Sequence, residues 1–187
     1  NRRTDRWGGD VTERMAFPLA VIDAVKETVV KYATKPFAIG YRFSPEEREE
    51  PGITMEDTLL FIQALADEEI DYLHVSINNF LAGSMRDATD TRGRIQLIQD
   101  AVGNRVPVIG VGGLQTVEQV EKALEIVPLV SLGHALIMDP EWYEKATTGQ
   151  EKEIFQALHR SKETELDIPK PLWDMITNVP GWFKVED

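Results

Sequence analysis

The chain has 187 residues and a net charge of −12; 42% of its residues are hydrophobic and 28% are charged. This balance is typical of one globular domain with a sizeable core. The acidic excess, with no basic stripe, argues against a general nucleic-acid or anionic-membrane binder. The chain has no Cys, which excludes disulfides and thiolate metal sites and fits the cytoplasm. No apolar run approaches the roughly 20 residues of a membrane span.

The first third of the sequence alternates helical and strand patterns. Apolar residues recur at spacings of three and four between residues 11 and 32, which predicts one helix. Pro18 falls early in this segment, where it is expected to kink or reset the first turn. Residues 36–43 predict a strand that Ser44-Pro45 ends. The acidic, proline-flanked stretch 46–52 is expected to be a solvated loop.

A second strand–helix pair follows a capping signal. Thr54 and Asp57 form a near-capping box, which predicts a helix start. The predicted apolar side of this helix consists of Leu59, Leu60, Ile62 (or Gln63) and Leu65. Residues 71–77 predict the next strand, followed by a polar loop over 78–89. A helix from about residue 90 is expected to end at Gly103-Asn104.

The later segments repeat this plan. The patterns predict strands at 106–111 and 129–132, helices at 116–126, 140–147 and 152–163, and a tail rich in proline and tryptophan. Alternating strands and helices imply a parallel sheet buried on both faces, hence an α/β fold. A (β/α)8 barrel needs eight such units in about 250 residues, so four strands suggest half of a TIM barrel. An open, doubly wound sheet of four or five strands is the alternative.

Two apolar strands end in glycine. Residues 107–114 read PVIGVGGL, and residues 129–137 read LVSLGHALI. Backbone N–H groups at such strand ends form anion sites, and in (β/α)8 barrels a phosphate often binds after strands seven and eight. The sequence therefore predicts a phosphate site here, although tight turns alone would also explain the glycines. The first ten residues lack Met and read like the middle of a protein, so we expect a fragment.

Several segments resemble one family collinearly over residues 1 to about 145. Residues 1–9 (NRRTDRWGG) resemble the N-x-R-x-D-x-[YW]-G-G loop of the old yellow enzyme family of FMN-dependent ene-reductases. Glu13-Arg14-Met15 partly matches the helix start that follows this loop in the family. The strands at 40–44 (GYRFS) and 71–76 (DYLHVS), and the segments 108–113 and 132–142, are similar to later strands. By this resemblance the chain is the C-terminal half of the family's barrel.

The resemblance implies a cofactor and a reaction. In this family FMN binds at the carboxyl ends of the strands, and NADH or NADPH supplies the hydride that reduces an activated alkene such as an enone. Arg42 would lie beside the flavin pyrimidine edge, where a guanidinium stabilises the reduced flavin. Backbone N–H groups of Gly112, Gly133 and His134 would bind the FMN phosphate, with Gly113 allowing close approach.

The same resemblance implies what the chain lacks. The family has arginine where this chain has His134, so a permanent cation is lost. The histidine/asparagine pair that binds the substrate carbonyl and the tyrosine proton donor belong to the first half of the barrel, so we assign no catalytic residue here. The isolated chain is expected to be inactive. It would pair with the missing N-terminal half or form a homo-oligomer. We place the domain boundary between 1–148, the FMN-binding half-barrel, and 149–187, a helix and tail.

Ordinary structural roles and other functions are alternatives to some of these assignments. A surface ion pair of Arg42 with Glu46 or Glu47 is the alternative to its flavin role. By the resemblance, the loop 78–88 borders the substrate side, and Arg86 would contact an anionic group there. His74 reads as a core or strand-end histidine and His159 as a solvated one; the histidines are too scattered for a metal site. Trp173 and Trp182 are expected to pack the tail against the barrel. Two other functions compete: a phosphate-binding barrel isomerase, lyase or synthase, and a non-catalytic fragment.

Overall fold

The computed structural model describes residues 2–187, so Asn1 of the N-terminal motif lies outside the described residues. The chain divides into two compact units. The first extends to Gly112 and includes Ala123–Val130, and the second comprises Gly113–Lys122 and Ser131–Asp187. No helix within residues 2–187 has both the length and the apolar character needed to cross a membrane.

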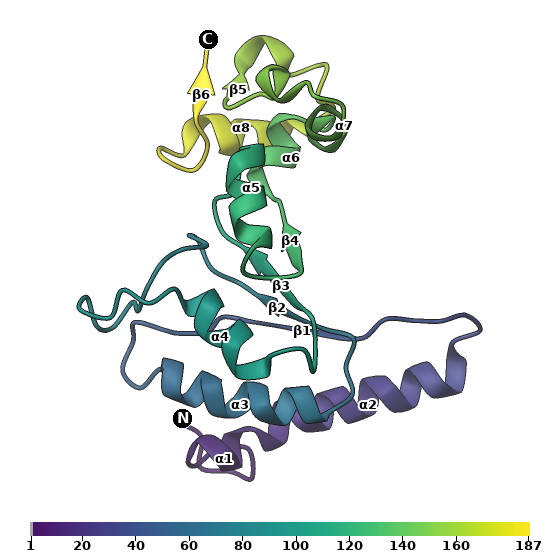
Figure 1. The fold of residues 1–187 in the computed structure, drawn as a ribbon, viewed down its shortest axis with the longest axis vertical. Helices are drawn as coiled ribbons and strands as arrows, with labels where there is room; N and C mark the ends of the chain where they lie inside the picture. Colours follow the sequence, from purple (N-terminus) through teal and green to yellow (C-terminus); the bar gives the residue numbers. More distant parts are fainter. Residues whose placement is uncertain (1) are drawn as a thin grey trace. The chain divides into compact units, whose positions relative to one another are not determined.

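Strands and helices alternate along the chain as the sequence predicts (Figure 1). Up to Gly112 the elements are α1 (Val11–Arg14), α2 (Ala16–Tyr32), β1 (Gly40–Phe43), α3 (Met55–Asp67), β2 (Tyr72–Val75), α4 (Arg94–Val102) and β3 (Val108–Val111). The next are α5 (Val117–Leu124), β4 (Leu129–Ser131), α6 (His134–Met138) and α7 (Trp142–Thr147). The last are η1 (Glu151–Glu153), β5 (Leu158–His159), η2 (Arg160–Lys162), α8 (Lys170–Asn178) and β6 (Val185–Glu186).

The main sheet has the order β1-β2-β3-β4, and β1–β2 and β2–β3 are parallel. This confirms the predicted α/β architecture. Side chains alternate between the two faces of a strand. On one face Leu73, Val75 and Val108 are fully buried, and the ring of Tyr41 packs edge-on against Phe61 of α3 at 5.5 Å between centroids. Figure 1 shows α2 and α3 along the same side of these strands.

The opposite face of the sheet is open in the first unit. It carries Arg42, His74 and Ile109, which follow one another in register across β1, β2 and β3. These three side chains are exposed or only partly buried. The expected burial of the sheet on both faces is therefore not found in the described part of the first unit, where α3 packs on the face that carries Tyr41. The polar row is therefore on the side that faces away from α3.

The helix predicted over 11–32 is divided at Met15. Asp10 and Glu13 form a capping box around α1, and the chain restarts as α2 at Ala16. Pro18 is the third residue of α2, where its missing N–H would have no intrahelical partner. The reset of the first turn is thus confirmed, and a single continuous helix is wrong.

Local capping sets the start of α3 as predicted. The Thr54 hydroxyl accepts from the Asp57 N–H at 3.1 Å, and the Asp57 carboxylate accepts from the Thr54 N–H. Ile62 and Leu65 are fully buried, whereas Leu60 is 50% exposed and does not belong to the buried side. Thr58, absent from the prediction, is buried because its hydroxyl donates to the Pro45 carbonyl.

Two later predictions need correction. The helix expected from residue 90 begins at Arg94, because the Asp90 carboxylate binds the backbone and side chain of Arg92 and does not cap the helix. The helix expected over 152–163 is wrong. The Phe155 N–H donates to Asp139 and the Leu158 N–H donates to the Lys184 carbonyl, so tertiary bonds replace helical ones.

The acidic loop after β1 is not a simple solvated loop. Glu46 is only 6% exposed, and its carboxylate accepts from the Ser84 hydroxyl at 2.7 Å and the Met85 N–H at 2.5 Å. The Arg94 guanidinium lies 3.8 Å from the same carboxylate. Burial lowers the pKa of Arg94, although Glu46 opposes that shift. Glu46 therefore joins the loop after β1 to the loop after β2.

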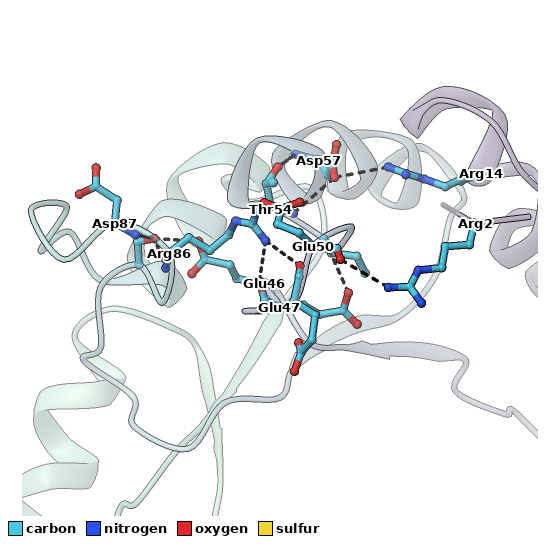
Figure 2. Close-up of polar contacts among 12 residues, drawn as sticks. Arg2, Arg14, Glu46, Glu47, Glu50, Thr54, Asp57, Arg86 and Asp87 are labelled. Atoms are coloured by element: carbon cyan, nitrogen blue, oxygen red, sulfur yellow. Dashed lines mark hydrogen bonds and ion pairs between the residues drawn. The ribbon is translucent and has the colours of Figure 1, made fainter.

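Arg86 also joins the loop after β2 to the loop after β1. Its guanidinium donates to the Glu47 carbonyl at 2.9 Å and the Glu49 carbonyl at 3.1 Å, and it pairs with the Glu50 carboxylate. Figure 2 shows these contacts between the two loops. Two arginines and a buried carboxylate thus hold the segments 46–50 and 84–94 together.

The second unit has its own buried ion pair. The Asp139 carboxylate is 1% exposed and accepts from Lys145 Nζ at 2.8 and 3.0 Å and from the Phe155 N–H. Burial alone would lower the pKa of Lys145, but Asp139 and Glu141 outweigh it and raise that pKa. A separate apolar cluster consists of Met138, Leu158, Trp173, Ile176 and Phe183. The tail therefore folds into a core of its own, with α8 as an element that the sequence did not predict.

Replacing Glu46 with Gln should lower the free energy of unfolding by about 3 kcal/mol, because a buried Arg94 would lose its counter-charge. Urea unfolding followed by circular dichroism measures this change. Glu49→Gln is the matched control, since that side chain is exposed in the same loop. Equal stability of the two variants would contradict the role given to Glu46.

Candidate functional site

Arg42 is the cation at the carboxyl end of β1. Its Nη2 donates to the Ser76 hydroxyl at 2.7 Å, and the residue is exposed. It forms no ion pair with a carboxylate in the part of the chain that the structure describes. The alternative pairing with Glu46 or Glu47 is wrong, because Glu46 binds Ser84 and Met85 and the Glu47 carboxylate accepts from the Ile53 N–H. The charge of Arg42 is therefore available on the open face.

His74 is the neighbour of Arg42 on β2. Burial lowers the pKa of His74, and the Arg42 cation lowers it further. Its Nε2 is buried and has no hydrogen-bond partner within residues 2–187. The imidazole is thus held neutral at neutral pH, so Arg42 carries the positive charge of this row alone. This agrees with the prediction of a core or strand-end histidine.

Gly112, after β3, is required by packing. Its φ is +142°, and a Cβ at this position would lie 2.5 Å from the backbone nitrogen of Phe80. The Phe80 N–H donates to the Gly112 carbonyl at 3.0 Å. The loop after β2 is thus pressed against the end of β3. Close packing against Phe80 therefore explains why this residue is glycine, whether or not a phosphate binds its N–H group.

Gly133 differs from Gly112. Its φ is −113° and its ψ is −82°, and no atom lies within 4 Å of the position of a Cβ. Within the second unit the N–H groups of Gly133 and His134 donate no hydrogen bond. Packing within the second unit does not demand glycine here, so the open space suits an approaching ligand.

His134 contacts the C-terminal aromatic residues. Its ring lies 4.1 Å from that of Phe183 and 6.4 Å from that of Trp182, measured between centroids. Trp173 is buried in the tail's own cluster. His159 lies on β5, not on a helix, with its Nε2 4.0 Å from the Glu186 carboxylate.

The structure distributes the five predicted cofactor-binding residues over both units. Arg42 and Gly112 belong to the first unit; Gly113, with φ of +65°, Gly133 and His134 belong to the second. Arg86, proposed to contact an anionic group, is engaged by the acidic loop and is not presented to a ligand. The sequence interpretation missed Ser76, although Ser76 has the same strand parity as His74 and so faces the same side as Arg42.

A groove of about 500 Å³ lies beside β1 in the first unit. Its apolar walls include Met15 of the α1–α2 junction, Tyr41 of β1 and Phe61 of α3. The ion pair between Arg14 and Asp57, 3.4 Å apart, contributes to the same lining. Because β1 is first in the strand order, this groove runs along an edge of the sheet.

Known proteins resemble the chain over most of its length. A probable NADH-dependent flavin oxidoreductase of Bacillus subtilis (strain 168) is 41% identical over 188 residues, covering 100% of this chain and 50% of the relative. An NADH:fumarate oxidoreductase of Klebsiella pneumoniae (strain 342) is 39% identical over 177 residues, covering 92% of the chain and 19% of that protein. The chain therefore spans about half the length of the first relative and less than a fifth of the second.

The fold also has a solved counterpart. A 2-naphthoyl-CoA reductase in complex with 2-naphthoyl-CoA superposes with a TM-score of 0.63 at 19% identity, covering 82% of this chain and 24% of that one. This likeness supports the fold alone, and it confirms the α/β half-barrel class. The sequence profile of one family matches residues 1–153. With that match added to the parallel βα units and their glycine-ended strands, the chain belongs to the NADH:flavin oxidoreductase / NADH oxidase family.

Proposed function

We propose that this chain is the C-terminal, cofactor-binding part of an FMN-dependent NAD(P)H oxidoreductase that reduces activated alkenes. The observation that carries the proposal is Arg42, an exposed guanidinium with no carboxylate partner within residues 2–187, on the open face at the carboxyl end of β1. Ligands of α/β folds bind at the carboxyl ends of the strands. Fumarate, named for the Klebsiella relative, is an alkene activated by carboxylates and belongs to the proposed substrate class.

The residues of this chain fit a phosphate-bearing flavin. In the second unit, the space at Gly133 and the N–H groups of Gly133 and His134 would receive the phosphate. By the family resemblance, Gly112 and Gly113 are further candidate donors. Arg42 would lie beside the flavin ring and favour its anionic reduced form. When bound, FMN would supply the hydride chemistry. His134 replaces the family's arginine, so the phosphate would rest mainly on backbone donors.

The proposed oxidoreductase needs the remainder of the barrel. The groove beside β1 and the exposed apolar residues of α2, namely Phe17, Val21 and Val25, support docking of a preceding half-barrel. The residues 1–148 would form the C-terminal half of an FMN-binding barrel, and 149–187 would pack on it. The preceding N-terminal half would supply the carbonyl-binding pair. A cytoplasmic location and homo-oligomeric assembly complete the proposal.

In the complete flavoprotein, Arg42→Ala should make the flavin midpoint potential more negative by roughly 30–60 mV, because losing about 1.4 kcal/mol from a two-electron couple corresponds to about 30 mV. Flavin binding should persist through the phosphate contacts. Spectroelectrochemistry measures the potential, and Arg48→Ala, which removes an exposed arginine of the next loop, is the control. An unchanged potential would place Arg42 away from the flavin ring.

The purified 187-residue chain should be colourless and lack ene-reductase activity. The flavin contacts of the preceding half are missing, and each lost hydrogen bond costs about 1 kcal/mol of binding. Absorbance at the flavin bands after gel filtration in excess FMN tests this. Stoichiometric retention of FMN would refute it.

The isolated chain should also self-associate at micromolar concentration. The edge of β1 and the apolar residues of α2, with Phe17 53% exposed, would recruit other chains. Sedimentation velocity measures the assembly state. A cooperative, monomeric species would show that this α/β unit is self-contained.

A further inference from the structure

We infer that Ser76 is the positioning residue of Arg42: its hydroxyl holds the guanidinium at the carboxyl edge of the sheet. The inference rests on the flavin site proposed above, and it adds a residue outside the predicted cofactor-binding set. Ser76 immediately follows β2, and its N–H donates to the Phe43 carbonyl of β1 at 2.8 Å. The serine is thus fixed by the backbone of the strand that carries Arg42.

A short hydrogen bond joins Arg42 to Ser76. The distance from Arg42 Nη2 to Ser76 Oγ is 2.7 Å, short for an N–H to O hydrogen bond and typical of one with a charged donor. A guanidinium has five donors on a long, flexible stem. Within residues 2–187, the Ser76 hydroxyl is the one side-chain acceptor that Arg42 reaches. Losing it would release the head group of Arg42 into many rotamers.

The neighbouring groups offer no substitute. His74 lies next to Arg42 in the β1–β2 register, but its Nε2 is buried and unbonded. Glu46 is occupied by Ser84, Met85 and Arg94. A hydroxyl therefore orients the cation while leaving its charge uncompensated. A carboxylate at this position would orient Arg42 equally well but neutralise it, which would defeat stabilisation of an anionic group.

The experiment uses the complete flavoprotein and compares Ser76→Ala with Arg42→Ala and the double variant. Ser76→Ala should slow flavin reduction about fivefold, the effect of one lost hydrogen bond, and shift the midpoint potential in the direction of Arg42→Ala. Ser76→Thr, which keeps a hydroxyl, should restore both values. Ser44→Ala, an exposed serine at the end of the neighbouring strand, is the matched control. In the double variant the potential should equal that of Arg42→Ala, because Ser76 acts through Arg42.

A second readout needs no flavin. The Arg42 cation lowers the pKa of His74, so NMR titration of His74 in the flavin-free protein reports where the guanidinium lies. Both Arg42→Ala and Ser76→Ala should raise this pKa. A His74 titration that responds to Arg42→Ala but not to Ser76→Ala would overturn the positioning role. So would additive shifts of the potential in the double variant.

The two readouts separate the inference from the proposed function. If Arg42→Ala leaves the potential unchanged while Ser76→Ala still raises the pKa of His74, Ser76 positions Arg42 but the flavin assignment fails. If Arg42→Ala changes the potential and Ser76→Ala changes neither quantity, the flavin assignment stands and the positioning role fails.

Discussion

The buried carboxylate of Glu46 is the constraint on which the loops around the candidate site depend. It lies after β1, yet its partners Ser84, Met85 and Arg94 belong to the loop after β2 and the start of α4. Taking a carboxylate and a guanidinium out of water is costly, and only close polar contacts offset that cost. Arg94 retains a buried Nη1 without a hydrogen-bond partner in the described chain. The pair thus fixes loop position more than it adds net stability.

Because of the pleat, alternate residues of each strand face opposite sides of the sheet: one side forms the core and the other carries the candidate site. Leu73 and Val75 face the helices and are fully buried, whereas His74 between them and Ser76 beyond them face the other side with Arg42. A one-residue shift in register would exchange these sets and bury the guanidinium against α3. The apolar core therefore determines where the charge of Arg42 is presented. The capped start of α3 and its ring contact with Tyr41 hold that register.

Local signals made much of the fold predictable. Each of these signals involves residues close together in the sequence. They are the Thr54–Asp57 capping box, the glycine after Val102 and the alternation of strands with helices, and all appear where the sequence predicts them. The burial of Glu46 depends on partners 38 and 39 residues away, which no local pattern encodes. The segment 152–163 has helical spacing, but Ile154 and Leu158 enter two different apolar clusters. Tertiary packing overrides propensity in such cases.

Some residues of the candidate site can be predicted from the sequence, and others only from the structure. Arg42 and the glycines stand out because their residue types suit an anionic ligand, and the family resemblance identifies them together. Ser76 does not stand out, since a serine after a strand has many ordinary roles, and only its 2.7 Å contact with Arg42 supports the positioning role proposed for it. Gly112 and Gly133 look alike in sequence, yet a Cβ at Gly112 would collide with the backbone at Phe80, whereas a Cβ at Gly133 would meet no atom. A glycine without a structural reason is the stronger sign of a ligand, and this places more weight on Gly133 than on Gly112 as the phosphate contact.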